Sequence, residues 1–515
     1  MIWKLSQQKT EGISSGAFVA ALTLVVVMLM GCHSWSEFGD GPGNPHRSEG
    51  DGPAGGLSSS LWLHPFGSTA TTHGAEVGML TDGAGDYFVA SYNGEIHVYD
   101  PSGTFQVAAA VPSGVGSRAV PYLVDDLPKR KTTIFAGSEG GGFHVIEIDK
   151  NTLPYTATVM ATAPGVGVSE SSPKRASSGE FYIAEQWGDV HRFHYNFSMG
   201  VLIHAATYSL GERVAGGIAV YDADPGSPGD EILVATQDGG FHVLNASLGA
   251  ILWSETTGYG TGGTPHDEYY GGVTVALRGA GDPLALLPMA AMVDPASPNT
   301  GRLRAINLTT RSIAWEMTPS HTLAGVDQIP GSISVLHPFW QIRPGLYQVF
   351  EGARIEDLYS DSLLVWTGPE DPNQEDQGLC GCITRTETSE PVWPEGFVPD
   401  FNNPAVIVSR LRHWATFAST DGYVYGVDLM TGNEVWDYKL STQGMDTPVT
   451  DRANVVYVGD GASNLHAVVG GSGAGLWTDP LITASATGAG TIVKLGITYR
   501  EELVVGSGVS AYILK

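Results

Sequence analysis

Apolar and polar residues alternate along short stretches of this chain, and turns that contain glycine separate one stretch from the next. In ASYNGEIHVYD (90–100), a small residue and a glycine turn are followed by apolar residues on either side of a polar ring. A period of two is that of a β-strand with one face towards a core, so each unit predicts a strand, a hairpin turn and a second strand. We therefore expect an all-β chain.

This hairpin pattern recurs along most of the sequence. The units are ASYNGEIHVYD (90–100), AGSEGGGFHVIEID (136–149), AEQWGDVHRFHY (184–195), ATQDGGFHVLN (235–245), ASTDGYVYGVD (418–428), GDGASNLHAVV (459–469) and, in its second half only, GRLRAINLTTRSIAW (301–315). The aligned ring or basic residues are His97, His144, His191, His242, Arg304, Tyr425 and His466. Their spacings are 47, 47, 51, 62, 121 and 41 residues. Hairpin repeats of about 40–50 residues are typical of β-propeller blades, each a four-stranded sheet.

One unit allows the repeat to be compared with a known family. DGYVYGVDLMTGNEVW (421–436) resembles the repeat of pyrroloquinoline-quinone (PQQ)-type propellers, a family that includes quinoprotein dehydrogenases and BamB-type lipoproteins. The resemblance implies that the tryptophans at the matching place pack between blades: Trp253, Trp315, Trp436 and, approximately, Trp477. The early units, such as GMLTDGAGDYFVASYNGEIHVYD (78–100), are similar instead to FG-GAP propeller repeats. Such likeness predicts a fold and leaves the function open.

The two ends of the repeat region are expected to complete one blade together. TIVKLGITYREELVVGSGVSAYIL (491–514) supplies two or three strands, and LSSSLWLHPF (57–66) is a candidate for the missing one. Pairing of terminal strands closes a propeller and leaves no free edge between its ends. We predict one β-propeller of eight four-stranded blades, with seven as the alternative. The region around 325–400 is interpreted as an elaboration at the edge of a blade.

The N-terminal residues have the pattern of a secretory signal. Lys4 and Lys9 precede an apolar run that begins at Ala17 and ends in Leu-Met-Gly-Cys at Cys32. That ending resembles a bacterial lipobox, which implies cleavage after residue 31 and a lipid on Cys32; an uncleaved anchor helix is the alternative. Residue 33 is His rather than Asp, which favours the outer membrane over the inner one. Either face of that membrane remains open.

Residues 32–58 are rich in Gly, Pro and Ser and have no apolar period. Such a segment buries too little surface to offset its ordering entropy, so we expect a tether that reaches roughly 30 Å. The predicted organisation is a signal peptide (1–31), the tether (32–58) and the propeller (59–515). With a net charge of −28, the chain should repel phosphate backbones, which excludes direct nucleic-acid binding.

An acidic loop is a candidate calcium site. Within YDADPGSPGDE (221–231), Asp222, Asp224 and Asp230 stand at positions 1, 3 and 9 of a loop that begins at Asp222, the spacing of Ca²⁺ loops in FG-GAP repeats. Asp82 and Asp86 form a weaker version of the same spacing. The alternative is a solvated acidic turn that binds no metal. We therefore predict no cofactor, with Ca²⁺ at this loop as the alternative.

Two loops and a cysteine pair complete the candidate sites. Cys380 and Cys382 are a candidate disulfide in an oxidising compartment. The long loop around them holds the aromatic residues Trp393 and Phe397, and a glycine-rich loop holds the second group of candidate partner-binding residues: His266, Tyr269 and Tyr270. Long loops in compact folds tend to be functional.

The recurring histidines are not expected to share a metal. Equivalent positions in adjacent blades lie too far apart for bonds of about 2 Å to one ion. We expect them to pack with hydrogen-bonded ring nitrogens.

The sequence favours a non-catalytic, membrane-anchored scaffold of the cell envelope that binds a protein partner. A PQQ-dependent oxidoreductase is one alternative, but it needs a quinone site, Ca²⁺ and a base that we cannot assign. A Ca²⁺-dependent extracellular glycan- or adhesin-type binder is the other. Apart from GISSG (12–16), which lies within the predicted signal peptide, the sequence contains no G-x-S-x-G, HExxH, Walker or CxxCH motif.

Overall fold

A computed structural model gives the fold of this chain, which divides into two units, residues 1–33 and 34–515. The structure describes parts of the second unit only. These are residues 52, 60–65, 78–90, 94–112, 120–138, 140–167, 171–214, 216–223, 229–256, 267–269, 272–278, 282–291, 301–321, 333–336, 339–341, 362–366, 382–384, 407–444, 447–462, 464–480, 492–497, 502–507 and 510–514. The predicted signal peptide and nearly all of the predicted tether lie outside them.

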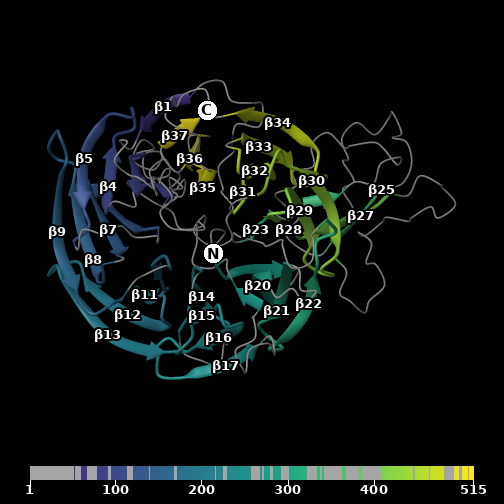
Figure 1. The fold of residues 1–515 in the computed structure, drawn as a ribbon, viewed down its shortest axis with the longest axis horizontal. Coiled ribbons are helices and arrows are strands. Elements are labelled where there is room, and N and C mark those ends of the chain that lie inside the picture. Colours follow the sequence, from purple (N-terminus) through teal and green to yellow (C-terminus); the bar gives the residue numbers. More distant parts are fainter. Residues whose placement is uncertain are drawn as a thin grey trace, which may run out of the picture. The chain divides into compact units, whose positions relative to one another are not determined.

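The described strands form nine antiparallel sheets, and eight of these follow one another around a ring as the blades of a β-propeller (Figure 1). Blades 1 to 4 consist of β2 (Gly78–Thr81), β3 (Tyr87–Ala90), β4 (Glu95–Tyr99) and β5 (Phe105–Ala110); β6 (Tyr122–Asp126), β7 (Lys131–Gly137), β8 (Phe143–Asp149) and β9 (Thr156–Ala163); β10 (Lys174–Arg175), β11 (Phe181–Ala184), β12 (Asp189–Asn196) and β13 (Val201–Ser209); and β14 (Ala219–Tyr221), β15 (Glu231–Ala235), β16 (Gly240–Leu244) and β17 (Ile251–Thr256).

The second half of the ring has the same construction. Blades 5 to 8 consist of β18 (Asp267–Tyr269), β19 (Thr274–Arg278), β20 (Asp282–Ala291), β21 (Arg302–Asn307) and β22 (Ser312–Met317); β23 (Ser334–Val335), β28 (Trp414–Ala418), β29 (Tyr423–Asp428) and β30 (Glu434–Lys439); β31 (Val449–Thr450), β32 (Val455–Gly459), β33 (Asn464–Val469) and β34 (Gly475–Pro480); and β35 (Ile492–Ile497), β36 (Leu503–Ser507), β37 (Ser510–Leu514) and β1 (Ser60–Pro65). The one described helix is a 3₁₀ turn, η2 (Leu127–Lys129).

Blade 8 closes the ring as the sequence predicts. β1 pairs antiparallel with β37, with Ser60 opposite Leu514 and Pro65 opposite Ser510. The innermost strand of this sheet, β35, contacts β2 of blade 1 and β31 of blade 7. The prediction of eight blades closed by terminal strands is therefore confirmed.

Two features lengthen the repeat. In blade 5, β18 and β19 both pair with the ten-residue β20, so this sheet has five strands instead of the predicted four. Between β23 and β28 of blade 6, the chain forms a ninth sheet of β24 (Phe339–Gln341), β27 (Ile407–Arg412), β25 (Ser362–Trp366) and β26 (Cys382–Thr384). This extra sheet lies within the longest gap of the repeat, where the sequence predicts an elaboration.

The core lies between neighbouring blades. The second strand of several blades is largely apolar, as in β32 (VVYVG) and in β28 (WATFA), where Thr416 is the one polar residue, and every residue of both strands is buried. Neighbouring sheets cover both faces of such a strand, so neither face is polar. Its residues are therefore apolar at successive positions rather than at alternate ones. Each apolar cluster spans a junction, as where Val424 and Trp436 of blade 6 meet Val456 of blade 7.

The tryptophans of the outer strands join successive blades. Trp315 of blade 5 donates its indole N–H to the carbonyl oxygen of Leu429 in blade 6 (3.0 Å). Trp436 of blade 6 donates in the same way to Gly470 of blade 7 (2.7 Å). The predicted packing of these two tryptophans between blades is confirmed.

Among the described residues, no helix has the length and hydropathy needed to cross a membrane.

Candidate functional site

Counted along the order of strands within each sheet, all seven aligned ring or basic residues lie on the third strand, which is β21 in blade 5 because β18 and β19 both pair with β20. Four of the histidines are almost fully buried and are bonded at both ring nitrogens. Nδ1 faces a hydroxyl on the outer strand and Nε2 a side chain at a turn: His144 with Thr162 and Ser138, His191 with Thr207 and Glu185, His242 with Ser254 and Glu212, and His466 with Thr478 and Asp460. For these four, the expectation of satisfied ring nitrogens is confirmed, so the shared arrangement is structural.

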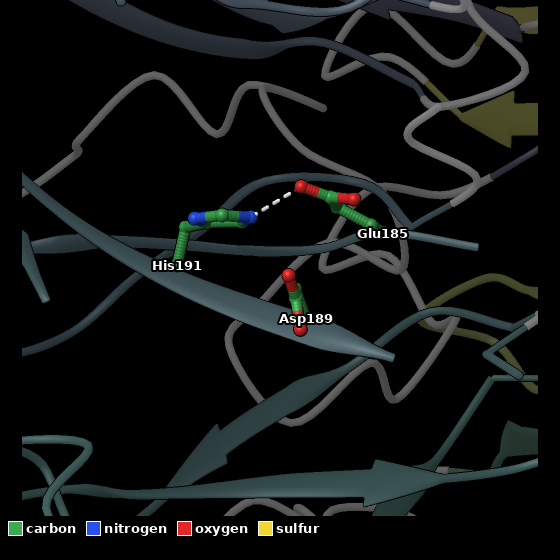
Figure 2. Close-up of side chains that lie close together, drawn as sticks. All are labelled: Glu185, Asp189 and His191. Atoms are coloured by element: carbon green, nitrogen blue, oxygen red, sulfur yellow. Dashed lines mark hydrogen bonds and ion pairs between the residues drawn. The ribbon is translucent and has the colours of Figure 1, made fainter. Parts of the chain in front are cut away.

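Blade 3 adds a second carboxylate, that of Asp189, to this arrangement. Glu185, Asp189 and His191 each direct one potential ligand atom to the same place, and these three atoms lie within 4.8 Å of one another (Figure 2). His191 Nε2 is 2.5 Å from Glu185 Oε1. No other such group of three occurs among the residues that the structure describes.

The β11–β12 turn holds these side chains in place. The backbone N–H of Glu185 donates to the carbonyl of Asp189 (2.8 Å), and the N–H of Gly188 donates to the carbonyl of Glu185 (3.0 Å). Gly188 has φ of 94°, and a Cβ there would lie 2.2 Å from the carbonyl oxygen of Glu212. Only glycine fits this turn, which fixes the positions of Glu185 and Asp189.

The electrostatics keep Glu185 ionised. Burial raises the pKa of this carboxyl, but hydrogen bonds from His191 and the Gly167 backbone outweigh burial, and the pKa lies below its usual value. On the other side of the ring, His191 Nδ1 lies 3.0 Å from Thr207 Oγ1 and 3.1 Å from His204 Nε2. Burial, and then the neighbouring His191, lower the pKa of His204.

Sequence reasoning missed the role of Asp189 and Glu185. Both stand in the quoted unit AEQWGDVHRFHY, two and six positions before His191. A comparison of these two positions among the aligned units would have singled out blade 3.

A second buried group of charges joins blades 1 and 2. The ammonium of Lys150 pairs with Asp82 and lies 2.6 Å from Asp86 Oδ2, and all three side chains are buried. Thr132 donates to Asp82 (2.8 Å). Lys150 thus forms ion pairs with both carboxylates that the sequence suggested as a weak Ca²⁺ loop, and its single charge balances one of them.

The stronger Ca²⁺ candidate is only partly described. Asp222 is exposed, and Asp230 Oδ2 accepts a hydrogen bond from the Ser177 backbone of blade 3 (2.6 Å). Asp224 lies outside the described residues, so the Ca²⁺ site stays a prediction.

The remaining predicted sites lie largely outside the described residues. Those not described are Cys32, Cys380, Trp393, Phe397, His266 and Tyr270. Cys382 begins β26 and Tyr269 ends β18, and only their backbones are described. The disulfide and the two partner-binding loops therefore stay predictions.

The outer strands of blades 1 to 3 form a surface that we call the uncharged rim. β5 (FQVAAA), β9 (TATVMATA) and β13 (VLIHAATYS) contain no Asp, Glu, Lys or Arg. β9 contacts both β5 and β13, and the three strands follow one another along one side of the ring (Figure 1). The exposed apolar residues on and beside β9 and β13 are Val159, Met160, Phe197, Met199, Val201 and Ile203.

Comparisons with known proteins agree on the fold. No protein-family model matches the sequence, and no curated protein sequence does. Solved structures similar to the chain include Sqt1 from Saccharomyces cerevisiae, with a TM-score of 0.55, 9% identity, and coverage of 89% of this chain and 99% of that one. The quinohemoprotein alcohol dehydrogenase from Comamonas testosteroni has a TM-score of 0.54, 11% identity and coverage of 96% and 82%. BamB from Moraxella catarrhalis has a TM-score of 0.48, 13% identity and coverage of 88% and 98%.

The class that fold and comparisons define is the β-propeller, in the form that quinoprotein dehydrogenases also have. At identities near 10%, this likeness concerns the frame, and the function depends on the sites built upon it.

Proposed function

We propose that this protein is a membrane-anchored scaffold of the cell envelope that binds a protein partner on its uncharged rim and catalyses no reaction. The composition of the outer strands carries the proposal. The outer strands of blades 4 to 7 each contain at least one carboxylate, as in SIAWEM and EVWDYK. Those of blades 1 to 3 contain none, and neither does β1 of the adjacent blade 8 (SLWLHP), although the chain has a net charge of −28.

An outer strand offers an open row of backbone donors and acceptors. Proteins usually protect such edges with charged side chains, proline or a covering element. β9 and β13 end their sheets, and no strand among the described residues pairs with their outer edges. The eight residues of β9 and nine of β13 are long for strands of this fold. Two long, uncharged edges side by side favour a partner that adds a strand.

The proposed partner is an extended protein segment with apolar side chains at alternate positions. Added as a strand to β13, it would hydrogen-bond the backbone, and alternate side chains would meet Val201 and Ile203, which are 44% and 48% exposed. Met160 of β9 continues this apolar surface across the blade junction, since its methyl group lies close to Gly200. The rigid ring supplies the frame, and the rim supplies the contact.

A crosslinking experiment tests the rim. A photoreactive amino acid at position 203 of the full-length chain should crosslink one protein in the membranes of the host cell. The same residue at position 435, on the charged strand β30, is the matched control because Val435 is also exposed (38%). Ile203→Glu should reduce co-purification of that protein at least tenfold, and Val435→Glu should leave it unchanged. Equal crosslinking at both positions, or equal effects of both variants, would reject the rim.

The anchor is a separate part of the proposal and rests on the sequence around Cys32. A lipid on this cysteine and the predicted tether would hold the propeller within roughly 30 Å of a membrane. Cys32→Ser should shift the protein from the membrane to the soluble fraction, whereas Cys382→Ser should not. Retention of Cys32→Ser in the membrane would argue against lipid anchoring.

A further inference from the structure

We propose that Glu185, Asp189 and His191 bind one divalent transition-metal ion, with zinc as the best match, at the β11–β12 turn of blade 3. This site is independent of the proposed rim function.

The donor atoms suit such an ion. One imidazole nitrogen and two carboxylate oxygens are common zinc ligands, with bonds of about 2.0–2.2 Å. Donors that share one ion at such lengths in a tetrahedron lie roughly 3.4 Å apart. On metal binding, the distance of 2.5 Å between Glu185 Oε1 and His191 Nε2 would lengthen slightly. The donor oxygen of Asp189 lies within 4.8 Å of the other two donor atoms, and rotation of its side chain would shorten these distances. The backbone turn need not move.

Binding of the ion requires the hydrogen of the His191 ring to be on Nδ1 rather than on Nε2. Without metal, an ionised Glu185 can only accept a hydrogen bond, so the 2.5 Å contact assigns the hydrogen to His191 Nε2. An ion on Nε2 requires the other neutral tautomer, with the hydrogen on Nδ1. Thr207 Oγ1, 3.0 Å from Nδ1, can accept it. Metal-bound histidines usually donate their second N–H in this way, which fixes the ring.

The fixed partners of Glu185 also suit a ligand. A Cβ on Gly167 would lie 2.3 Å from Glu185 Oε2, so the backbone approaches this carboxylate more closely than any other residue would allow. The side chain of Glu185 is only 9% exposed and that of His191 only 3%. Ligands held in this way lose little conformational freedom when an ion binds.

The other blades show what is special about blade 3. Among the aligned units, it alone carries acidic residues both two and six positions before the aligned residue. Blade 7 comes nearest, with Asp460 bonded to His466 Nε2 at 3.2 Å, but Asn464 takes the place of Asp189. Blade 1 has Glu95 two positions before His97 and a serine, Ser91, six before. The buried histidine of the repeat is therefore structural, and the additional carboxylate of blade 3 gives that blade a set of three metal-binding donor atoms.

The repeat provides a matched pair of variants. Asp189→Asn gives blade 3 the asparagine that blade 7 has at the matching position, Asn464, while keeping Glu185 where blade 7 has Asp460. Asn464→Asp gives blade 7 two carboxylates beside its histidine, as in blade 3. The full-length protein, freed of metal and titrated with Zn²⁺ against a chromophoric chelator, should bind one ion tightly. Asp189→Asn should weaken that binding by roughly 100-fold, and Asn464→Asp should add a second tight ion.

Cobalt gives an independent readout. Co²⁺ alone should produce visible absorption bands of a four- or five-coordinate site in the wild type, and these bands should disappear in Asp189→Asn. His466→Gln, which removes the buried histidine of blade 7, should leave the absorption bands unchanged. Equal metal uptake by the wild type and Asp189→Asn, or none by either, would overturn the proposal. Unchanged circular dichroism of Asp189→Asn guards against loss of the fold.

Discussion

At the scale of single residues, Lys150 shows how a charge is held between blades. It is 5% exposed, and its partners Asp82 and Asp86 are 0% and 1% exposed. Burial, and then repulsion by Asp82, raise the pKa of Asp86 despite Lys150. The sequence could not predict this contact, because 68 residues separate Lys150 from Asp82 and Lys150 lies outside the aligned units.

Removal of the ammonium should be costly. Lys150→Met leaves two buried carboxylates without a cation, and breaking a buried pair in this way costs about 3–5 kcal/mol. Lys129→Met is the control, because the Lys129–Asp126 pair is 72% and 41% exposed and solvent screens it, so its loss should change stability little. Urea denaturation of both variants at pH 7 measures the difference. Equal losses of stability would contradict a structural role for Lys150.

His144 should make stability depend on pH. Burial lowers its pKa to about 4 from an ordinary value of 6.5. As pH falls from 6.5 to 4, the unfolded chain binds a proton that the folded ring does not bind, so stability falls over that window and is fully present above it. His144→Gln lacks this group. The stability difference between wild type and variant should therefore change by about 2–3 kcal/mol between pH 7 and pH 4. A constant difference in urea titrations would disprove the assignment.

At the scale of elements, the sequence predicts the hairpin formed by the second and third strands of a blade, but not the first strand that pairs with this hairpin. The second and third strands of each blade contain the apolar alternation and the glycine turn, so the aligned positions fall on the third strand throughout. The first strands are short, as in β10, β23 and β31 with two residues each, and too short for any periodicity. The Glu212–His242 contact was missed for a related reason: Glu212 lies on the connection between blades 3 and 4, and the repeat pattern covers only the hairpins.

The contact between Gly473 of blade 7 and the Trp436 ring of blade 6 gives a testable prediction. Gly473 has φ of +71°, and a Cβ there would lie 2.8 Å from the Trp436 ring. Gly211 has φ of +73° and nothing within 4 Å of the same position. Gly211→Ala should cost about 1 kcal/mol from backbone strain alone. Gly473→Ala should cost at least about 1 kcal/mol more and alter the near-ultraviolet circular dichroism of tryptophan. Equal costs would mean that the Trp436 contact adds nothing.

At the scale of the whole molecule, the ring depends on β1. The repeat predicted eight blades because the composite sheet was counted, and the pairing of β1 with β37 confirms that count. The five-stranded blade 5 could not be predicted, because residues 257–300 lack the repeat motif while β18 and β19 share the single long partner β20.

A pair of truncations tests the closing strand. A chain that begins at residue 59 keeps β1, and one that begins at residue 66 lacks it. Both lose the hydrogen bond from Gly52 to Asp451, so this contact does not affect the comparison. The shorter chain should lose a few kcal/mol of stability and associate through the exposed edge of β37. Thermal denaturation and size-exclusion chromatography measure both effects. Identical melting temperatures would show that β1 is dispensable.

The same closing strand also sets a waiting time during synthesis. β37 is made 454 residues after Ser60, so at about 5–20 residues per second the ribosome needs roughly 20–90 s to deliver the partner of β1. Blades 1 to 7 can form in sequence during that interval. Blade 8 cannot, and both ends of the growing ring stay uncovered until the last strand arrives. A factor that shields nascent chains would therefore act on this protein most usefully in the interval before β37 emerges.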